Sequence, residues 1–222
     1  MAPATSARGA RAWLVSLSFW LWAGLSFALT AGLMVAHTYA LPQPAIEDPV
    51  LQAAVASTRE PVDGMRWRAL HVLYSRCRCS QRILTQLFER GPLSDVSERV
   101  VLVGANTDYE LAARTAGFAV DVITPEQLTT RYGVLAAPLF VVADARDKLR
   151  YVGGYTERKQ GLAARDVQIL TNLRAGRGAD ALPLFGCAVS DSLRAILDPL
   201  FVRAPEGAPR TDPWPAGNRA SL

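Results

Sequence analysis

Histidine and cysteine are scarce in this chain, and their scarcity excludes several kinds of site. The 222 residues include two histidines, His37 and His71, and three cysteines. A zinc site of three histidines is therefore excluded, and His37 and His71 lie too far apart in the sequence for HExxH or for the histidine pair of a Cys₂His₂ zinc finger. The sequence also lacks the phosphate-binding pattern GxxxxGK[ST] and the hydrolase pattern GxSxG. The cysteines remain the most reactive side chains, and Cys77 and Cys79 are separated by one residue.

The chain has little excess charge of either sign. It contains 24 Lys and Arg and 20 Asp and Glu, and two of the arginines, Arg8 and Arg11, precede the first acidic residue. Without these two the counts are 22 and 20, which gives no electrostatic basis for binding nucleic acid. The composition is that of a globular protein, and no internal repeat is visible. We therefore expect one folded domain with appended segments and no nucleic-acid partner.

One long uncharged run lies near the N-terminus. Trp13 to Ala36 spans 24 residues without a charged side chain, and a helix of this length crosses a hydrocarbon core of about 30 Å. Cleavage after Ala40 as a signal peptide is the alternative, but the run is longer than the roughly 7–15 apolar residues of such a peptide. We expect an uncleaved anchor. The basic flank, Arg8 and Arg11, favours a cytoplasmic N-terminus and places the chain after Leu41 outside the cytoplasm.

Changes in composition divide the chain into four parts. Residues 1–41 are expected to form the cytoplasmic N-terminus and the transmembrane anchor. Residues 42–64 are expected to form a linker able to hold a short helix, since Asp48 precedes a proline as a helix cap does. Residues 65–203 are expected to form the folded domain with a C-terminal helical extension. Residues 204–222 hold four prolines and two glycines and are expected to be disordered.

The order of the predicted elements indicates an α/β fold. Short apolar runs predict strands, and capping signals with helical periodicity predict helices. The predicted strands are Arg68–Tyr74, Val100–Val103, Val120–Ile123, Leu139–Ala143 and Leu149–Val152. The predicted helices are Cys79–Arg90, Thr107–Ala116, Thr124–Tyr132, Leu162–Arg174 and Ala188–Leu197. Helices between the early strands and a hairpin near the end predict a mixed sheet covered on both faces.

The segment Ser75–Ser80 joins the end of a predicted strand to the start of a predicted helix and contains two cysteines. A thiolate at this place is stabilised by free backbone N–H groups and by the positive end of the helix dipole. Arg76, Arg78 and Arg82 add positive charge nearby. The segment is therefore where redox chemistry is expected. The alternative is that the two cysteines are small residues of an arginine-rich turn, joined as an inert staple.

Two segments resemble a known family. Val72–Cys77 resembles the run from strand to active site in thioredoxin-like proteins, and Tyr132–Val142 resembles their segment with the cis-proline. An extra helix and strand at residues 103–124 are similar to the insertion of membrane-anchored, TlpA/ResA-type thiol-disulfide oxidoreductases. The resemblance implies a thioredoxin-like mixed sheet with flanking helices, preceded by one transmembrane helix. It also implies Cys77 as the nucleophile and Pro138 as the cis-proline that faces it and positions the substrate backbone.

The chain departs from the family pattern at several positions. The family motif Cys-x-x-Cys puts Ser80 where the second cysteine is expected, so that Cys79 comes one position early and the motif is CxC. Arg76 replaces the usual tryptophan, and Ala137 replaces the polar residue that usually precedes the cis-proline. A bridge between Cys77 and Cys79 would close a short, strained ring, which favours a labile disulfide over a structural one.

Cys187 is the third thiol and lies at or just before the start of a predicted helix. It is either a small buried residue or a functional thiol that resolves a mixed disulfide or acts as a third ligand. If the cysteines are catalytic, the thiol that resolves the mixed disulfide is Cys79 or Cys187. His71, in the middle of a predicted strand, is expected to be a packed side chain rather than a ligand.

Three functions compete at this point. The first is an exported, membrane-tethered thiol-disulfide oxidoreductase, in which Cys77 attacks a disulfide and Cys79 or Cys187 resolves the intermediate without a cofactor. Its partners would be cysteine-containing exported proteins, and the resemblance suggests a membrane electron donor. The second is a thiolate site, made by Cys77, Cys79 and Cys187, that binds and delivers Cu(I). The third is a non-catalytic thioredoxin-like interaction module. Under each of these functions, the N-terminal run predicts a single-pass membrane protein with its C-terminal domain on the periplasmic side.

Overall fold

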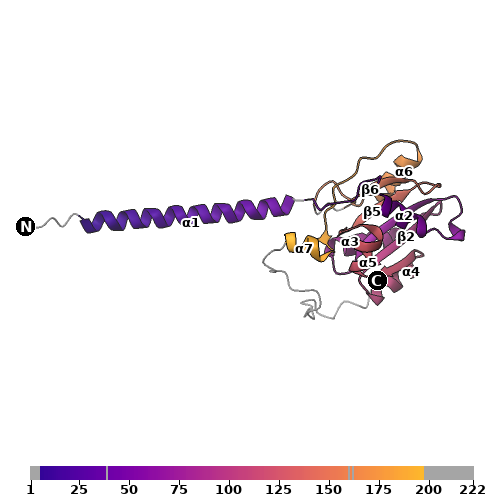
Figure 1. Ribbon diagram of the computed structural model, residues 1–222, viewed down its shortest axis with the longest axis horizontal. Coiled ribbons are helices and arrows are strands. Elements are labelled where there is room, and N and C mark those ends of the chain that lie inside the picture. Colours follow the sequence, from indigo (N-terminus) through magenta and orange to yellow (C-terminus); the bar gives the residue numbers. More distant parts are fainter. Residues whose placement is uncertain (1–5, 39, 160, 162, 198–222) are drawn as a thin grey trace, which may run out of the picture.

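One long helix precedes the globular body of the chain (Figure 1). The computed structural model describes residues 6–38, 40–159, 161 and 163–197. Helix α1, Ser6–Thr38, covers the predicted run. Its segment Trp13–Gly32 is long and apolar enough to cross a membrane, and none of that segment is buried. The expected tail, residues 204–222, lies outside the described residues.

The body is built on a five-stranded mixed sheet. Its strands are β1 (Trp67–Tyr74), β2 (Val96–Val103), β3 (Ala119–Ile123), β5 (Leu139–Ala143) and β6 (Leu149–Gly153). The order across the sheet is β3-β2-β1-β5-β6. The first three strands are parallel to one another, and β5 and β6 form an antiparallel hairpin beside β1. A second, two-stranded sheet pairs β4 (Ala136–Ala137) with β7 (Cys187–Ala188). The mixed sheet predicted from the sequence is confirmed.

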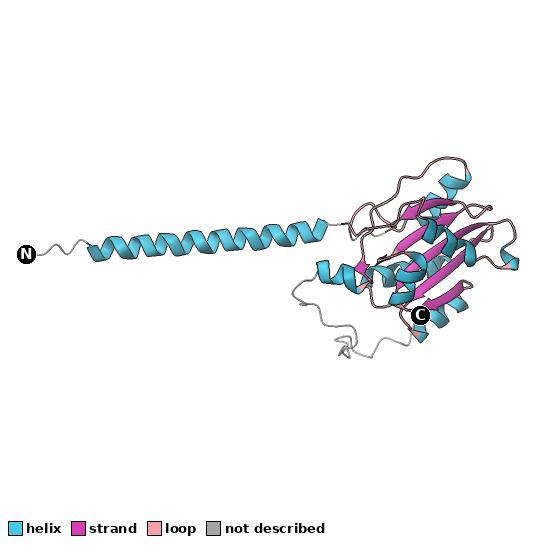
Figure 2. Cartoon of the chain, in the orientation of Figure 1, coloured by secondary structure: helices cyan, strands magenta, loops and turns pink. Residues whose placement is uncertain are grey.

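Helices cover both faces of the sheet, as Figure 2 shows for the cyan helices around the magenta strands. They are α2 (Pro49–Ser57), α3 (Arg78–Arg90), α4 (Thr107–Thr115), α5 (Pro125–Tyr132), α6 (Asp166–Arg174) and α7 (Asp191–Leu197), with a 3₁₀ turn at Pro61–Asp63. Side chains of a strand point alternately to the two faces. Leu70, Val72 and Tyr74 of β1 therefore pack with α2 and α5, whereas Ala69 and Leu73 pack with α3, α4 and α6.

Local capping signals place two of the helices. The side chain of Asp48 accepts hydrogen bonds from the N–H groups of Val50 and Leu51, both 2.9 Å long, and so begins α2. Thr124 and Gln127 form the capping box that begins α5. Helix α2 buries Leu51, Ala54 and Val55 in the same apolar cluster as side chains of β1. This part of the expected linker therefore packs on the folded body. The boundary at residue 64 stays a prediction.

The C-terminal part of the fold differs from the prediction. The expected helix from Ala188 begins instead at Asp191, and Cys187 lies in β7 rather than next to a helix start. The backbone of these residues pairs with β4 and is not free to form a helix. Ser190 then caps α7, because its Oγ accepts from the N–H of Leu193 at 3.2 Å.

Two other boundaries shift. Strand β2 begins at Val96 rather than Val100, because its parallel ladder with β1 starts where Trp67 pairs with Val96. Helix α6 begins at Asp166 rather than at residue 162, which lies outside the described residues.

Candidate functional site: a disulfide beside the cis-proline

Cys77 lies where β1 ends and α3 begins. It is the N-cap residue of α3 and has an extended backbone, with φ −97° and ψ 119°. Its N–H donates to the carbonyl oxygen of Tyr74 at 3.0 Å, and its own carbonyl accepts from Gln81 at 2.9 Å. The side chain is 0% exposed. The predicted place of this cysteine, at the strand-to-helix junction, is confirmed.

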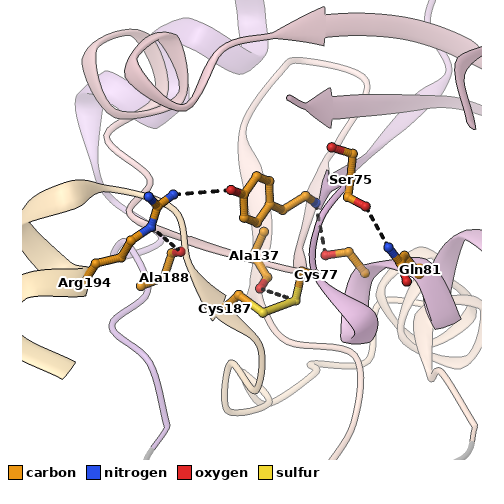
Figure 3. The surroundings of a disulfide bond; sticks show 9 residues. Ser75, Cys77, Gln81, Ala137, Cys187, Ala188 and Arg194 are labelled. Atoms are coloured by element: carbon orange, nitrogen blue, oxygen red, sulfur yellow. Dashed lines mark hydrogen bonds between the residues drawn. A yellow bond between two sulfur atoms is a disulfide. The ribbon is translucent and has the colours of Figure 1, made fainter. Parts of the chain in front are cut away.

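A disulfide joins Cys77 to Cys187, and Figure 3 shows it among its neighbours. The two cysteines are 110 residues apart in the sequence, and their Cα atoms are 6.0 Å apart. That separation is normal for a disulfide. The bridge between Cys77 and Cys79 considered from the sequence is not formed, and Cys79 is a free, partly exposed thiol in the first turn of α3.

The partner cysteine is held by β4, immediately before the proline. Cys187 pairs with Ala137 in an antiparallel register, and Ala188 pairs with Ala136. The peptide bond between Ala137 and Pro138 is cis, as the resemblance implies. The Sγ atom of Cys77 lies 3.9 Å from the carbonyl oxygen of Ala137. The disulfide therefore stands directly beside the segment that carries the cis-proline.

Arg194 of α7 ties the neighbouring backbone to the end of β1, and Figure 3 shows its side chain beside Ala188. Its Nη2 donates to the carbonyl oxygen of Val189 at 2.9 Å and to the hydroxyl of Tyr74 at 3.3 Å. Its Nε donates to the carbonyl oxygen of Ala188 at 3.3 Å. Sequence reasoning missed Arg194, because a single arginine in a short helix gives no signal that it contacts a distant strand.

Ser80 occupies the position of the second cysteine in the family motif. Its side chain is 0% exposed, and its Oγ accepts a hydrogen bond from the N–H of Tyr74 at 3.0 Å. The hydroxyl therefore completes the turn between β1 and α3. A hydroxyl cannot form a disulfide, so the partner of Cys77 comes from β7 instead.

Three arginines give the cysteine turn a positive surface. Arg76, Arg78 and Arg82 are all exposed. None of the three takes part in the salt bridges found among the described residues, which pair Arg59, Arg90 and other arginines with carboxylates. No ion pair among the described residues therefore offsets the positive charge of this turn.

His71 lies on the opposite face of the sheet from Cys77. Its Nε2 is 3.1 Å from Oε2 of Glu98, and its Nδ1 is 2.9 Å from the hydroxyl of Tyr155. Arg90 also donates to Glu98, at 2.7 Å. Burial acts to raise the pKa of Glu98, but the hydrogen bonds and charges of His71 and Arg90 outweigh it and lower the pKa to about 2. The expectation that His71 is a packed side chain is confirmed.

The copper-site hypothesis gains no support from the side-chain geometry. Within residues 6–197, as far as they are described, no group of three or more His, Cys, Asp or Glu side chains is placed to hold a metal ion. A Cu(I) site needs thiolates, and Cys77 and Cys187 are joined to each other as a disulfide.

Comparisons with known proteins give matches among solved structures. No family model matches the chain, and no curated protein matches it. A hypothetical protein from Sinorhizobium meliloti is similar with a TM-score of 0.46 and 16% identity, covering 57% of this chain and 80% of that one. An uncharacterized conserved protein from Geobacillus kaustophilus has a TM-score of 0.44 and 17% identity, with 69% and 90% covered. A secreted disulfide oxidoreductase from Mycobacterium tuberculosis has a TM-score of 0.36 and 14% identity, with 51% and 84% covered.

These TM-scores are all below 0.5, so the fold is recognised by features of the chain itself. The strand order β3-β2-β1-β5-β6 combines a parallel half with an antiparallel hairpin. A cysteine occupies the N-cap position of the helix that follows the central strand, and a cis-proline precedes β5. The fold is thioredoxin-like.

Proposed function

We propose that this thioredoxin-like chain is a thiol-disulfide oxidoreductase whose redox couple is Cys77 and Cys187. The observation that carries the proposal is the disulfide between the N-cap cysteine of α3 and the strand paired with Ala137, next to the cis-proline. Thiol-disulfide exchange needs a disulfide that a thiolate can attack and a partner sulfur that can leave. The Cys77–Cys187 pair supplies both without a cofactor.

The reaction balances with the two cysteines and a partner that carries two thiols. A partner with two thiols gives two electrons and two protons to the Cys77–Cys187 disulfide, so that the partner becomes a disulfide and the two cysteines become thiols. The reverse reaction reduces a partner disulfide and regenerates the bridge. Each half proceeds through a mixed disulfide between one protein sulfur and one partner sulfur.

The partners we propose are cysteine-containing exported proteins and a membrane-bound electron donor or acceptor. The donor or acceptor would return Cys77 and Cys187 to their starting redox state. The apolar segment Trp13–Gly32 of α1 supports tethering at a membrane, because its length and hydropathy suit a transmembrane helix. The basic residues before it favour a cytoplasmic N-terminus, which puts the redox domain on the periplasmic side. Disulfide chemistry suits that side, because the cytosol keeps thiols reduced.

Membrane topology is tested separately from catalysis. Intact cells or spheroplasts expressing the full chain are treated with a protease, and membranes are extracted with alkaline carbonate. We expect the redox domain to be digested from the periplasmic side and the chain to resist extraction. A soluble species that starts near Leu41 would contradict the anchor but not export, and protection in spheroplasts would contradict export.

The catalytic proposal is tested on the full chain in detergent. The fraction of Cys77–Cys187 disulfide is measured across glutathione redox buffers, together with the rate of insulin reduction. We expect Cys77→Ser and Cys187→Ser to abolish turnover in insulin reduction and Cys79→Ser, the matched control, to retain it. A bridge that never equilibrates with glutathione contradicts the proposal and favours the interaction module. Stoichiometric copper in reduced protein without exchange favours the Cu(I) site.

A further inference from the structure

The two cysteine residues of the disulfide differ in their exposure to solvent. Cys77 is 0% exposed, whereas Cys187 is partly exposed, as are Gly186 and Ala188 on either side of it. A disulfide opens when a thiolate attacks one of its sulfurs, and access is one of the factors that decide which. The difference in exposure favours attack by an external thiolate on Cys187 in the oxidised protein.

Cys77 is enclosed by the body and by a short segment that we call the C-terminal arm, Leu184–Ser190. The arm runs antiparallel to β4 and pairs Cys187 with Ala137. The Sγ of Cys77 lies 3.9 Å from the carbonyl oxygen of Ala137, and its side chain belongs to the same buried cluster as Leu184 and Val189 of the arm. The arm thus occupies the edge of β4 beside the buried sulfur.

The arm is held by contacts that do not involve sulfur. The carbonyl oxygen of Leu184 accepts from the N–H of Leu41 at 2.8 Å, and the N–H of Val189 donates to Leu135 at 2.8 Å. Both Leu184 and Val189 are 0% exposed, and Arg194 donates to the carbonyl oxygen of Val189. None of these contacts requires the disulfide, so we expect the arm to keep its place and Cys77 to stay covered when the bridge is reduced.

We infer that Cys187, and not Cys77, is the sulfur that forms mixed disulfides with partners, and that Cys77 is the enclosed thiol that resolves them. The inference rests on the proposed function and reverses the roles that the family resemblance implies. Cys187 is thereby assigned as the catalytic residue that touches the partner.

The steps follow from this division. During reduction of the protein, a partner thiolate attacks Sγ of Cys187, a new S–S bond forms, and the Cys77 thiolate leaves. A second partner thiolate then attacks the partner sulfur and releases Cys187 as a thiolate, which takes up a proton as Cys77 does. During reduction of a partner disulfide, the Cys187 thiolate attacks it, and the Cys77 thiolate displaces the partner from Cys187 and restores the bridge.

The first experiment follows attack on the native disulfide. The full chain with Cys79→Ser, which leaves only the two cysteines in question, is mixed with glutathione in detergent and quenched with acid after short times. Free thiols are blocked with N-ethylmaleimide, and peptides are identified by mass spectrometry. We expect glutathione on Cys187 and N-ethylmaleimide on Cys77 at the earliest times.

The outcomes separate the inference from the function on which it rests. Glutathione first on Cys77 overturns the inference while leaving thiol-disulfide exchange in place. An absence of any adduct, with the bridge unchanged in redox buffers, contradicts the proposed function and the inference with it.

The second experiment compares single thiols in the folded chain. Cys77→Ser with Cys79→Ser leaves Cys187 alone, and Cys187→Ser with Cys79→Ser leaves Cys77 alone. We expect the lone Cys187 to be alkylated roughly tenfold faster or more, because a covered thiol reacts only after local opening, and to accumulate mixed disulfides with partners. In denaturant the two rates should converge. Equal rates in the folded proteins would overturn the inference.

Discussion

Gly186 lies so close to Ala137 that a Cβ atom on residue 186 would stand 2.6 Å from the carbonyl carbon of Ala137. The same atom would stand 2.5 Å from Cδ of Pro138. Both neighbours belong to the segment that carries the cis-proline, so neither can move as the end of a flexible side chain does. Glycine at residue 186 is therefore what lets the C-terminal arm approach β4 and bring Cys187 to Cys77.

Gly186→Ala should separate the arm from β4. We expect a loss of about 1–3 kcal/mol of stability from the steric overlap, a smaller fraction of Cys77–Cys187 disulfide at a given glutathione ratio, and faster alkylation of Cys77 in the reduced protein. The fraction is measured by mass spectrometry after thiol blocking. Gly178→Ala is the matched control, because nothing lies within 4 Å of a Cβ there. The same oxidised fraction in both variants would show that the close approach does not control the bridge.

Glu98 should make the stability of the fold depend on acid pH. Its pKa is lowered from an ordinary 4.5 to about 2 in the folded chain. The ionised form is therefore favoured by folding, and this stabilisation is present above about pH 4.5 and lost as the pH falls toward 2. Since a difference of one pKa unit corresponds to about 1.36 kcal/mol, the free energy of unfolding should fall by on the order of 3 kcal/mol.

Denaturant unfolding of wild type and Glu98→Gln across this pH range measures the effect. The variant should be less stable at neutral pH, and the difference should shrink as the pH falls. Glu89→Gln serves as the control, since Glu89 is exposed one residue before Arg90. Parallel pH profiles for wild type and Glu98→Gln would contradict the role of the buried pair with His71 and Arg90.

Ser80→Ala should weaken the fold without stopping exchange. The substitution removes the side-chain acceptor of the Tyr74 N–H, and an unpaired buried N–H costs about 1–3 kcal/mol. The redox couple is unchanged, so the rate of insulin reduction below the unfolding transition should match wild type. Thr85→Ala, which removes an exposed hydroxyl from the same helix, should cost less. Loss of exchange in the folded Ser80→Ala protein would assign Ser80 a part in the chemistry.

The positive charge of Arg76 and Arg78 should speed reduction of the disulfide by anionic thiols. Reversing one charge changes the interaction with a unit charge about 8 Å away in water by about 1 kcal/mol, or roughly fivefold in rate. We therefore expect Arg76→Glu and Arg78→Glu to slow reduction by glutathione by this factor at low salt and to leave reduction by neutral mercaptoethanol nearly unchanged. Arg146→Glu is the control, since Arg146 is exposed in the β5–β6 turn. Equal effects on both thiols would argue against electrostatic selection.

Sequence patterns determined the elements whose signals are local. The capping box at Thr124, the cap at Asp48 and the apolar run of β1 each depend on residues within a few positions of one another, and each appears in the structure. The place of Cys77 at the junction of a strand and a helix follows from the same local signals. The apolar run of α1 is likewise a property of consecutive residues.

Only the tertiary structure decided which thiol pairs with Cys77. Cys79 is two residues away in the sequence, yet it remains free, and the partner is Cys187, 110 residues further on. The pairing depends on the antiparallel contact between β4 and β7, on the absence of a side chain at Gly186 and on the enclosure of Cys77. A two-residue strand is too short to show a hydrophobic periodicity in the sequence. The distance between two remote sulfurs is set by packing rather than by local sequence.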